Sequence, residues 1–194
     1  MKRKSILFVL TLFVFVLWSN VGSTAGDYAI GSTLEDFKMS DTTGAEQSFN
    51  KLKGEKGAII VFLSAQCPVV KGYNARINKI ADEYKAKGIN FIGVNSNATE
   101  SLEWVKSNAD ENYKFPVLID KGNVLADKLG ASVTPEFYYF DKGNVLLYHG
   151  ALDNDRSGKN VTTNYLRDAF DSALSKQPIK TAKTNAIGCS IKRV

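Results

Sequence analysis

The chain has 194 residues, of which 44% are hydrophobic and 23% are charged, as is usual for one ordinary globular domain. Its formal net charge is +5, and Lys2, Arg3 and Lys4 carry part of that excess. Without those three residues the net charge falls to about +2, which does not indicate a basic surface for phosphates. We therefore expect no nucleic-acid partner.

The N-terminal segment has the pattern of a secretory signal peptide. The basic residues 2–4 precede an apolar stretch from Ile6 to Trp18, and the small residues Ser23-Thr24-Ala25 follow it. An apolar stretch of about 13 residues is short for a membrane-spanning helix, which needs about 20. We expect residues 1–25 to be removed, with cleavage after Ala25, and the alternative is an uncleaved membrane anchor. The mature protein is then secreted or periplasmic and has no stable association with the membrane.

The first elements of the mature chain are a hairpin and a buried strand. Residues 28–52 alternate apolar anchors with the turn signal Asp41-Thr42-Thr43-Gly44, which predicts a short β-hairpin. The run from Ala58 to Leu63 is unbroken, apolar and rich in β-branched residues, so it predicts a strand covered on both faces. The spacing of apolar residues after Pro68 predicts a helix from Pro68 to Lys87, ended by Gly88.

Cys67 lies between this strand and this helix. Pro68 suits the first helical position, where its missing N–H has no partner to lose, so Cys67 falls at the N-cap. Unpaired backbone N–H groups and the positive end of the helix dipole would face its sulfur. At such positions thiol pKa values fall from about 8.5 to roughly 3.5–7.5. The sequence thus predicts that Cys67 is a redox-active cysteine whose sulfur is exposed enough to meet a partner.

The segment from Phe62 to Lys71, FLSAQCPVVK, resembles the active-site segment of the thioredoxin superfamily. The resemblance is strongest to the redoxin (AhpC/TSA) branch and, within it, to the peroxiredoxin-like group. Cys67 matches the first cysteine of the superfamily pair, the surface nucleophile, and Val70 replaces the second. The typical peroxidatic motif, Pro-x-x-x-Thr/Ser-x-x-Cys, fails at Leu63, Cys67 and Val70. The resemblance therefore implies the fold without implying peroxidase chemistry.

Alternating strands and helices are expected in the second half of the chain. The predicted strands are residues 89–95, 115–120, 131–140 and 145–148, and the predicted helices lead up to Ala109, cover 123–129 and cover 162–176. Asn95 and Asn97 follow a strand at its carboxyl end, the edge that faces the ligand in open α/β sheets. They either lie near Cys67 or serve only in capping and turn formation.

Thr134-Pro135 immediately precedes an aromatic strand and is similar to the cis-proline of the thioredoxin family. The resemblance implies that this peptide packs against the active-site cysteine and that the backbone of Thr134 can bind an extended substrate. Glu136 either tunes the thiol or is an exposed charge at the strand end, and we expect the exposed charge. His149, the only histidine, is expected to be a surface residue rather than a ligand or a base. No pattern indicates a metal site or a cofactor.

Residues 179–194 form a tail that carries the second cysteine, Cys189. No helix or strand is evident in it, and its Gly-Cys-x-Ile-Lys sequence is similar to the tail of the peroxiredoxin-like group. The tail can bring Cys189 over the helix that begins after Cys67. Export places both cysteines where disulfides persist. The pair is then a nucleophile with its resolving thiol, a permanent staple, or two free thiols, and a Cα separation within about 7 Å is required for bonding.

These patterns together predict a thioredoxin-like three-layer α/β/α fold with a mixed central sheet and an N-terminal hairpin, covering residues 26–178. The favoured function is an exported thiol-disulfide oxidoreductase that uses Cys67, with Cys189, Thr134 and Pro135 completing the site. Its partners would be protein thiols and disulfides. One alternative is an antioxidant thiol peroxidase acting on a small peroxide. The other is a non-catalytic binding module in which the cysteines form a structural disulfide.

Overall fold

The computed structural model describes residues 28–194, so the predicted signal peptide over residues 1–25 lies outside the described part. The strands are β1 (Lys38–Ser40), β2 (Glu46–Ser48), β3 (Gly57–Leu63), β4 (Ile89–Asn95), β5 (Val117–Ile119), β6 (Val133–Thr134), β7 (Glu136–Asp141), β8 (Leu146–Gly150) and β9 (Cys189–Ser190). The helices are α1 (Phe49–Leu52), α2 (Pro68–Lys85), α3 (Leu102–Asn112), the 3-10 turn η1 (Lys121–Asn123), α4 (Val124–Leu129) and α5 (Tyr165–Leu174).

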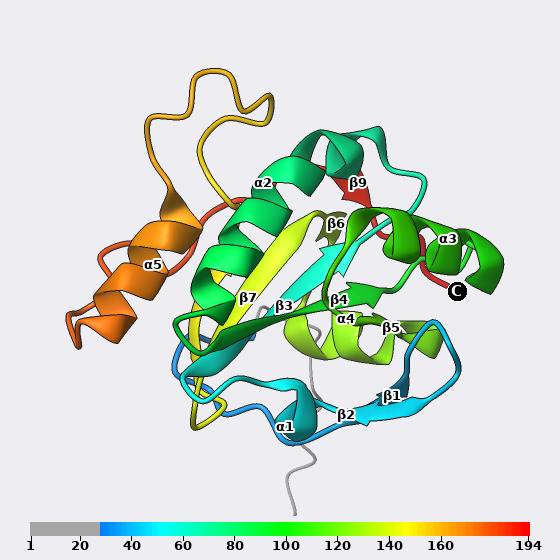
Figure 1. The fold of residues 1–194 in the computed structure, drawn as a ribbon, viewed down its shortest axis with the longest axis horizontal. Coiled ribbons are helices and arrows are strands. Elements are labelled where there is room, and N and C mark those ends of the chain that lie inside the picture. Colours follow the sequence, from blue (N-terminus) through cyan, green and yellow to red (C-terminus); the bar gives the residue numbers. More distant parts are fainter. Residues whose placement is uncertain (1–27) are drawn as a thin grey trace, which may run out of the picture.

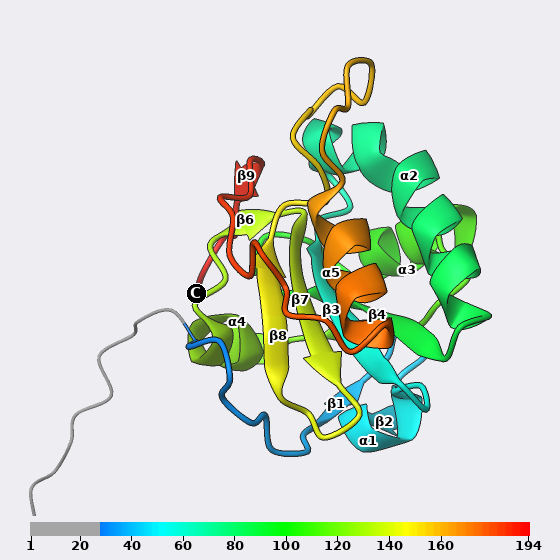
Figure 2. The ribbon, with the colours of Figure 1, turned by 90° about the vertical axis from the view of Figure 1, so that its left-hand side faces the viewer.

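The centre of the fold is a five-stranded mixed sheet with the order β5-β4-β3-β7-β8 (Figure 1). Strands β3, β4 and β5 are parallel, whereas β7 runs antiparallel to β3 and β8 antiparallel to β7. Helices α2, α3 and α5 cover one face, and α4 lies on the other (Figure 2). The small sheet β1-β2 forms the predicted hairpin. The predicted three-layer α/β/α architecture is confirmed.

Strand β3 joins the two halves of the core. Side chains of successive strand residues point to opposite faces, and all seven residues of β3 are buried. Ile59, Val61 and Leu63 pack under α2 and α5, whereas Ala58, Ile60 and Phe62 pack against α1 and α4. This double burial explains the continuous apolar run and fixes the position of the loop that follows Leu63.

Helix α2 ends earlier than predicted, and helix α5 begins later than predicted. Helix α2 stops at Lys85 because the backbone turns towards Gly88, which adopts a φ of +88°. Helix α5 begins at Tyr165 because the backbone N–H groups of residues 162 and 163 both donate to Oδ1 of Asn154. That side chain closes the preceding loop and holds these two residues outside the helix.

The expectation that His149 lies at the surface is wrong. Only 4% of the residue is exposed, because β8 is covered by the C-terminal tail. The backbone of Ala182 and Thr184 bonds to His149 and places residue 183 beside it in a parallel bridge. The imidazole ring stacks on Tyr138, which faces it across the β7-β8 pair, with ring centroids 5.3 Å apart.

Substitution of Phe170 tests the packing of α5 on the sheet. It is fully buried and contacts the rings of Tyr84, Phe91 and Tyr139. Phe170→Ala should lower the free energy of unfolding by about 3–5 kcal/mol, because it removes apolar contacts and leaves a cavity. Urea denaturation of the oxidised protein measures this. The control, Trp104→Ala, alters an aromatic residue that is 52% exposed and should cost about 0.5 kcal/mol or less. Equal losses in the two variants would contradict the assignment.

Candidate active site

Cys67 is the N-cap residue of α2, as predicted. Its backbone is extended, with φ −76° and ψ 116°, and Pro68 occupies the start of the helix. The backbone N–H of Cys67 donates to Oγ of Ser64 at 3.1 Å, and its carbonyl oxygen accepts from Lys71 N at 3.2 Å. The side chain of Cys67 makes no capping hydrogen bond. The sulfur therefore lies at the positive end of the longest helix among the described residues.

Cys67 and Cys189 form a disulfide. Their Cα atoms lie 6.1 Å apart, although 122 residues separate them in the sequence. Of the arrangements left open by the sequence, two free thiols are therefore wrong for this state of the protein. The disulfide joins the C-terminal tail to the first turn of α2.

The peptide bond between Thr134 and Pro135 is cis, which confirms the expectation from the family resemblance. The carbonyl oxygen of Thr134 lies 3.6 Å from Sγ of Cys67. Thr134 is also the register partner of Cys189 in the antiparallel pair of β6 and β9. The structure thus brings together all four predicted site residues, Cys67, Cys189, Thr134 and Pro135.

The tail occupies the backbone edge that the sequence assigns to an extended substrate. Strand β9 pairs with β6, so the expectation that the tail has no strand of its own is wrong. The approach is close at Gly188, where an added Cβ atom would lie 1.9 Å from the carbonyl oxygen of Thr134. Glycine at this position lets the tail reach the cis peptide. The tail therefore pairs with Thr134 as an added strand pairs with a sheet edge.

The expectation that Cys67 is a surface nucleophile is wrong for the oxidised protein. Only 3% of Cys67 is exposed, whereas Cys189 is partly exposed and Ser190 is exposed. Cys67 belongs to the core cluster under α2, and Cys189 packs against the edge of that cluster. The two sulfurs of the pair thus differ in their access to solvent.

Glu100 supports the loop before Cys67, a role that the sequence analysis missed. Its carboxylate accepts from Ser64 Oγ at 2.5 Å, from the backbone N–H groups of Ala65 and Gln66 at 3.0 Å, and from Asn95 Nδ2 at 2.6 Å. Because Ser64 Oγ also accepts from Cys67 N, the carboxylate positions the cysteine through one side chain. An acidic residue 33 positions further along the chain gave no local signal of this contact.

Asn97 joins the loop after β4 to both β3 and the tail. Its Nδ2 donates to the carbonyl oxygen of Leu63 at 3.3 Å, and its Oδ1 accepts from Lys192 N at 3.0 Å. Asn95 also accepts from Asn97 N, in a local turn. Turn formation and proximity to the site, which were alternatives in the sequence, therefore occur together.

Glu136 is buried, so its expected role as an exposed strand-end charge is wrong. Its exposed fraction is 8%. One carboxylate oxygen accepts from the backbone N–H groups of Ser132 at 3.0 Å and Val133 at 3.4 Å, and the other accepts from Tyr138 Oη at 3.1 Å. Glu136 thereby fixes the turn that leads into the cis peptide.

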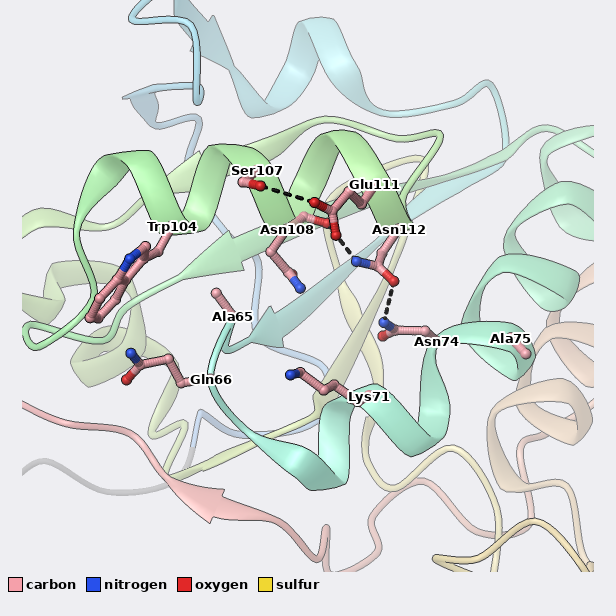
Figure 3. A pocket seen from close by; sticks show the side chains of 10 residues that line it. All are labelled: Ala65, Gln66, Lys71, Asn74, Ala75, Trp104, Ser107, Asn108, Glu111 and Asn112. Carbon is pink, nitrogen blue, oxygen red and sulfur yellow. Dashed lines mark hydrogen bonds between the residues drawn. The ribbon is translucent and has the colours of Figure 1, made fainter.

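A groove of about 710 Å³ lies beside the loop before Cys67, between α2 and α3 (Figure 3). Ala65 and Gln66 border it at one end, and Lys71 and Trp104 line it. Asn74 and Asn112 bridge its far end through a hydrogen bond of 2.9 Å. Within residues 28–194, no three His, Cys, Asp or Glu side chains are placed to hold a metal ion.

The role of Glu100 is tested by Glu100→Gln. The new amide group would turn its own N–H donors towards two of the four donors that the carboxylate accepts, so we expect a loss of roughly 1–3 kcal/mol in the free energy of unfolding. Urea denaturation of the oxidised protein measures it. Glu103→Gln is the matched control, since Glu103 is exposed on the first turn of α3. An equal effect in both variants would contradict the positioning role.

The chain is similar to known proteins over most of its length. Residues 30–149 match the model of the AhpC/TSA family. Thiol-disulfide oxidoreductase ResA of Bacillus thuringiensis (strain Al Hakam) is 27% identical over 150 residues, which cover 73% of this chain and 85% of that protein.

Solved structures show the same fold. A hypothetical protein of Sinorhizobium meliloti 1021 is 31% identical, with a TM-score of 0.79 over 87% of this chain and 97% of that chain. The exposed lipoprotein thioredoxin Etrx1 of Streptococcus pneumoniae strain TIGR4 is 20% identical, with a TM-score of 0.55 over 73% of this chain and 99% of that one. Because the family model covers more than half of its length, the chain belongs to the AhpC/TSA family and has a thioredoxin-like fold.

Proposed function

We propose that this protein is an exported thiol-disulfide oxidoreductase whose redox centre is the pair Cys67 and Cys189. The observation that carries the proposal is the position of the disulfide, between the N-terminus of α2 and the cis peptide at Thr134-Pro135. The name of the similar ResA proteins, thiol-disulfide oxidoreductase, supports the same class of reaction.

In this proposal Cys67 is the redox-active nucleophile of the pair. When the disulfide is opened, the N–H groups of the first turn of α2 stabilise its thiolate. When the ring closes, that thiolate attacks Cys189 in a mixed disulfide with a partner: the Cys67–Cys189 bond forms, the bond from Cys189 to the partner breaks, and the partner's sulfur leaves as a thiolate, so the partner's disulfide has gained two electrons. Thr134 and Pro135 hold the tail so that the two sulfurs meet. Partner proteins supply the thiols and disulfides.

Export is part of the proposal and rests on the signal-peptide pattern of residues 1–25. Among residues 28–194, every helix is too short or too polar to cross a bilayer. An oxidising compartment suits a protein that depends on disulfide exchange. We propose that the mature protein is secreted or periplasmic and does not stay bound to the membrane.

Reduction of insulin by dithiothreitol tests the proposed reaction. The wild-type protein should accelerate it, and Cys67→Ser and Cys189→Ser should each lower the acceleration at least tenfold, because ring closure needs both sulfurs. Turbidity of the released insulin B chain gives the rate. Ser190→Ala is the matched control, since it alters the exposed neighbour of Cys189 and keeps both thiols.

Two results would contradict the oxidoreductase. One is an unchanged rate in both cysteine variants. The other is a wild-type disulfide that dithiothreitol opens only when the protein unfolds, which would make the pair a structural staple and favour the binding module.

The site of signal cleavage is tested by the mass of the exported protein. In a bacterial host that secretes it, the N-terminus of the mature form should be Gly26, because the small residues at 23–25 meet the requirement of signal peptidase. Intact-mass spectrometry of the extracytoplasmic fraction measures this. As a control, Ala25→Leu should slow processing. Recovery of the full 194-residue chain from the membrane fraction would contradict cleavage and favour an uncleaved anchor.

A further inference from the structure

The two sulfurs of the disulfide differ in the access that they give to a partner. Cys67 is 3% exposed and lies within the core cluster under α2. Cys189 is partly exposed, and its neighbours include Ser190, which is exposed, and Ile187, which is 61% exposed. The surface around Cys189 is therefore open, whereas Cys67 lies below it.

The geometry of thiol-disulfide exchange makes this difference decisive. An attacking thiolate approaches one sulfur along the line of the bond that breaks, on the side opposite the leaving sulfur. Attack on Cys67 has to reach a residue that is only 3% exposed and belongs to the core cluster. Attack on Cys189 has to reach a residue that is partly exposed and lies next to the exposed Ser190. Exchange at Cys189 also has the better leaving group, because the helix N-terminus stabilises the departing Cys67 thiolate.

Contacts after Cys189 hold the tail in place independently of the disulfide. Ile191 is 5% exposed, and its N–H donates to the carbonyl oxygen of Ser132 at 3.0 Å. The carbonyl oxygen of Lys192 accepts from Ala98 N at 2.7 Å. Arg193 then binds Oδ1 of Asp127 through Nε at 2.8 Å.

Contacts before Cys189 fix the other end of the same segment. Thr184 N donates to the carbonyl oxygen of His149 at 3.1 Å, and Thr184 Oγ1 lies 2.7 Å from the hydroxyl of Tyr148. Hydrogen bonds therefore hold the chain at Thr184, five residues before Cys189, and at Ile191, two residues after it. None of these contacts involves either sulfur, so the docking of the tail does not depend on the disulfide itself.

We propose that partner proteins react at Cys189, and that Cys67 is the buried thiolate that releases them. This inference rests on the proposed function and assigns a role to each sulfur. The tail is then the arm that carries the covalently bound partner, on the docked strand β9. The partner is a polypeptide that presents a cysteine or a disulfide at its surface.

In the reduced protein the Cys189 thiolate attacks a partner disulfide, a bond forms between Cys189 and one partner sulfur, and the other partner sulfur leaves as a thiolate that takes up a proton. Cys67 then attacks Sγ of Cys189, the Cys67–Cys189 bond forms, and the second partner sulfur leaves. The partner gains two electrons and two protons, and the protein loses them. Oxidation of a partner dithiol is the reverse sequence.

Stopped-flow reaction of the reduced proteins with 5,5'-dithiobis(2-nitrobenzoate) at pH 8.5, where an ordinary thiol is substantially ionised, tests the assignment. Cys67→Ser, which keeps Cys189, should react within about threefold of the first phase of the wild type. Cys189→Ser, which keeps Cys67, should react at least tenfold more slowly because the docked tail covers its sulfur. A Cys189→Ser variant that reacts as fast as Cys67→Ser, or faster, overturns the proposal.

Release of the tail provides a second readout. Deletion of residues 192–194 in the Cys189→Ser background removes the contacts of Lys192 and Arg193, and it should speed the reaction of Cys67 at least threefold. Lys180→Ala in the same background is the control, since it removes one positive charge from an exposed part of the tail and should change nothing. An unchanged rate after the deletion also overturns the proposal. Failure of the proposed function is separate, because it would appear as absent insulin reduction while the order of thiol reactivity stays as described.

Discussion

The pairing of β9 with β6 is the interaction on which the site depends. It places Cys189 opposite Thr134, and the carbonyl oxygen of the same threonine lies beside Sγ of Cys67. Three distant segments of the chain therefore meet at one cis peptide. Their meeting needs a close approach at Gly188, where any side chain would collide with the backbone of Thr134. Strand β9 places Cys189 beside Cys67, and the N-terminus of α2 places Cys67 at the positive end of a helix.

Two carboxylates, that of the partly buried Glu100 and that of the buried Glu136, support the two sides of this arrangement. Glu100 holds the loop that leads to Cys67, and Glu136 holds the turn that leads to Thr134. Each accepts backbone N–H groups that would otherwise lack partners near the site. The disulfide adds to this rigidity, because closing a loop of 122 residues stabilises the folded chain by about 4–5 kcal/mol in the chain-entropy model. The tail is nevertheless docked by its own contacts, so its position and the redox state of the cysteines are separate properties.

Much of the fold and part of the site could be predicted from the sequence. The apolar run of β3 and the Cys67-Pro68 junction are local signals, and the family resemblance supplied the cis peptide at Thr134-Pro135. Burial of His149 and Glu136 could not be predicted, because it depends on the tail and on a turn that pack against them from elsewhere in the chain. The position of Cys67 at the start of the helix could be predicted from the local sequence. Its burial beneath β9 could not, because β9 lies far along the chain. Val70 replaces the second cysteine of the superfamily and is a core residue with 1% exposure. The second sulfur of the disulfide is that of Cys189 in the tail.

The most direct test of the account is a redox titration of the folded protein. Oxidised protein is equilibrated with mixtures of reduced and oxidised dithiothreitol, the free thiols are blocked with N-ethylmaleimide, and near-ultraviolet circular dichroism is recorded in parallel. The account predicts one two-electron transition at Cys67 and Cys189, during which the tertiary signal of the native fold is kept. A pair that accepts electrons only as that signal is lost would contradict a redox centre and show that the bond is a permanent part of the scaffold.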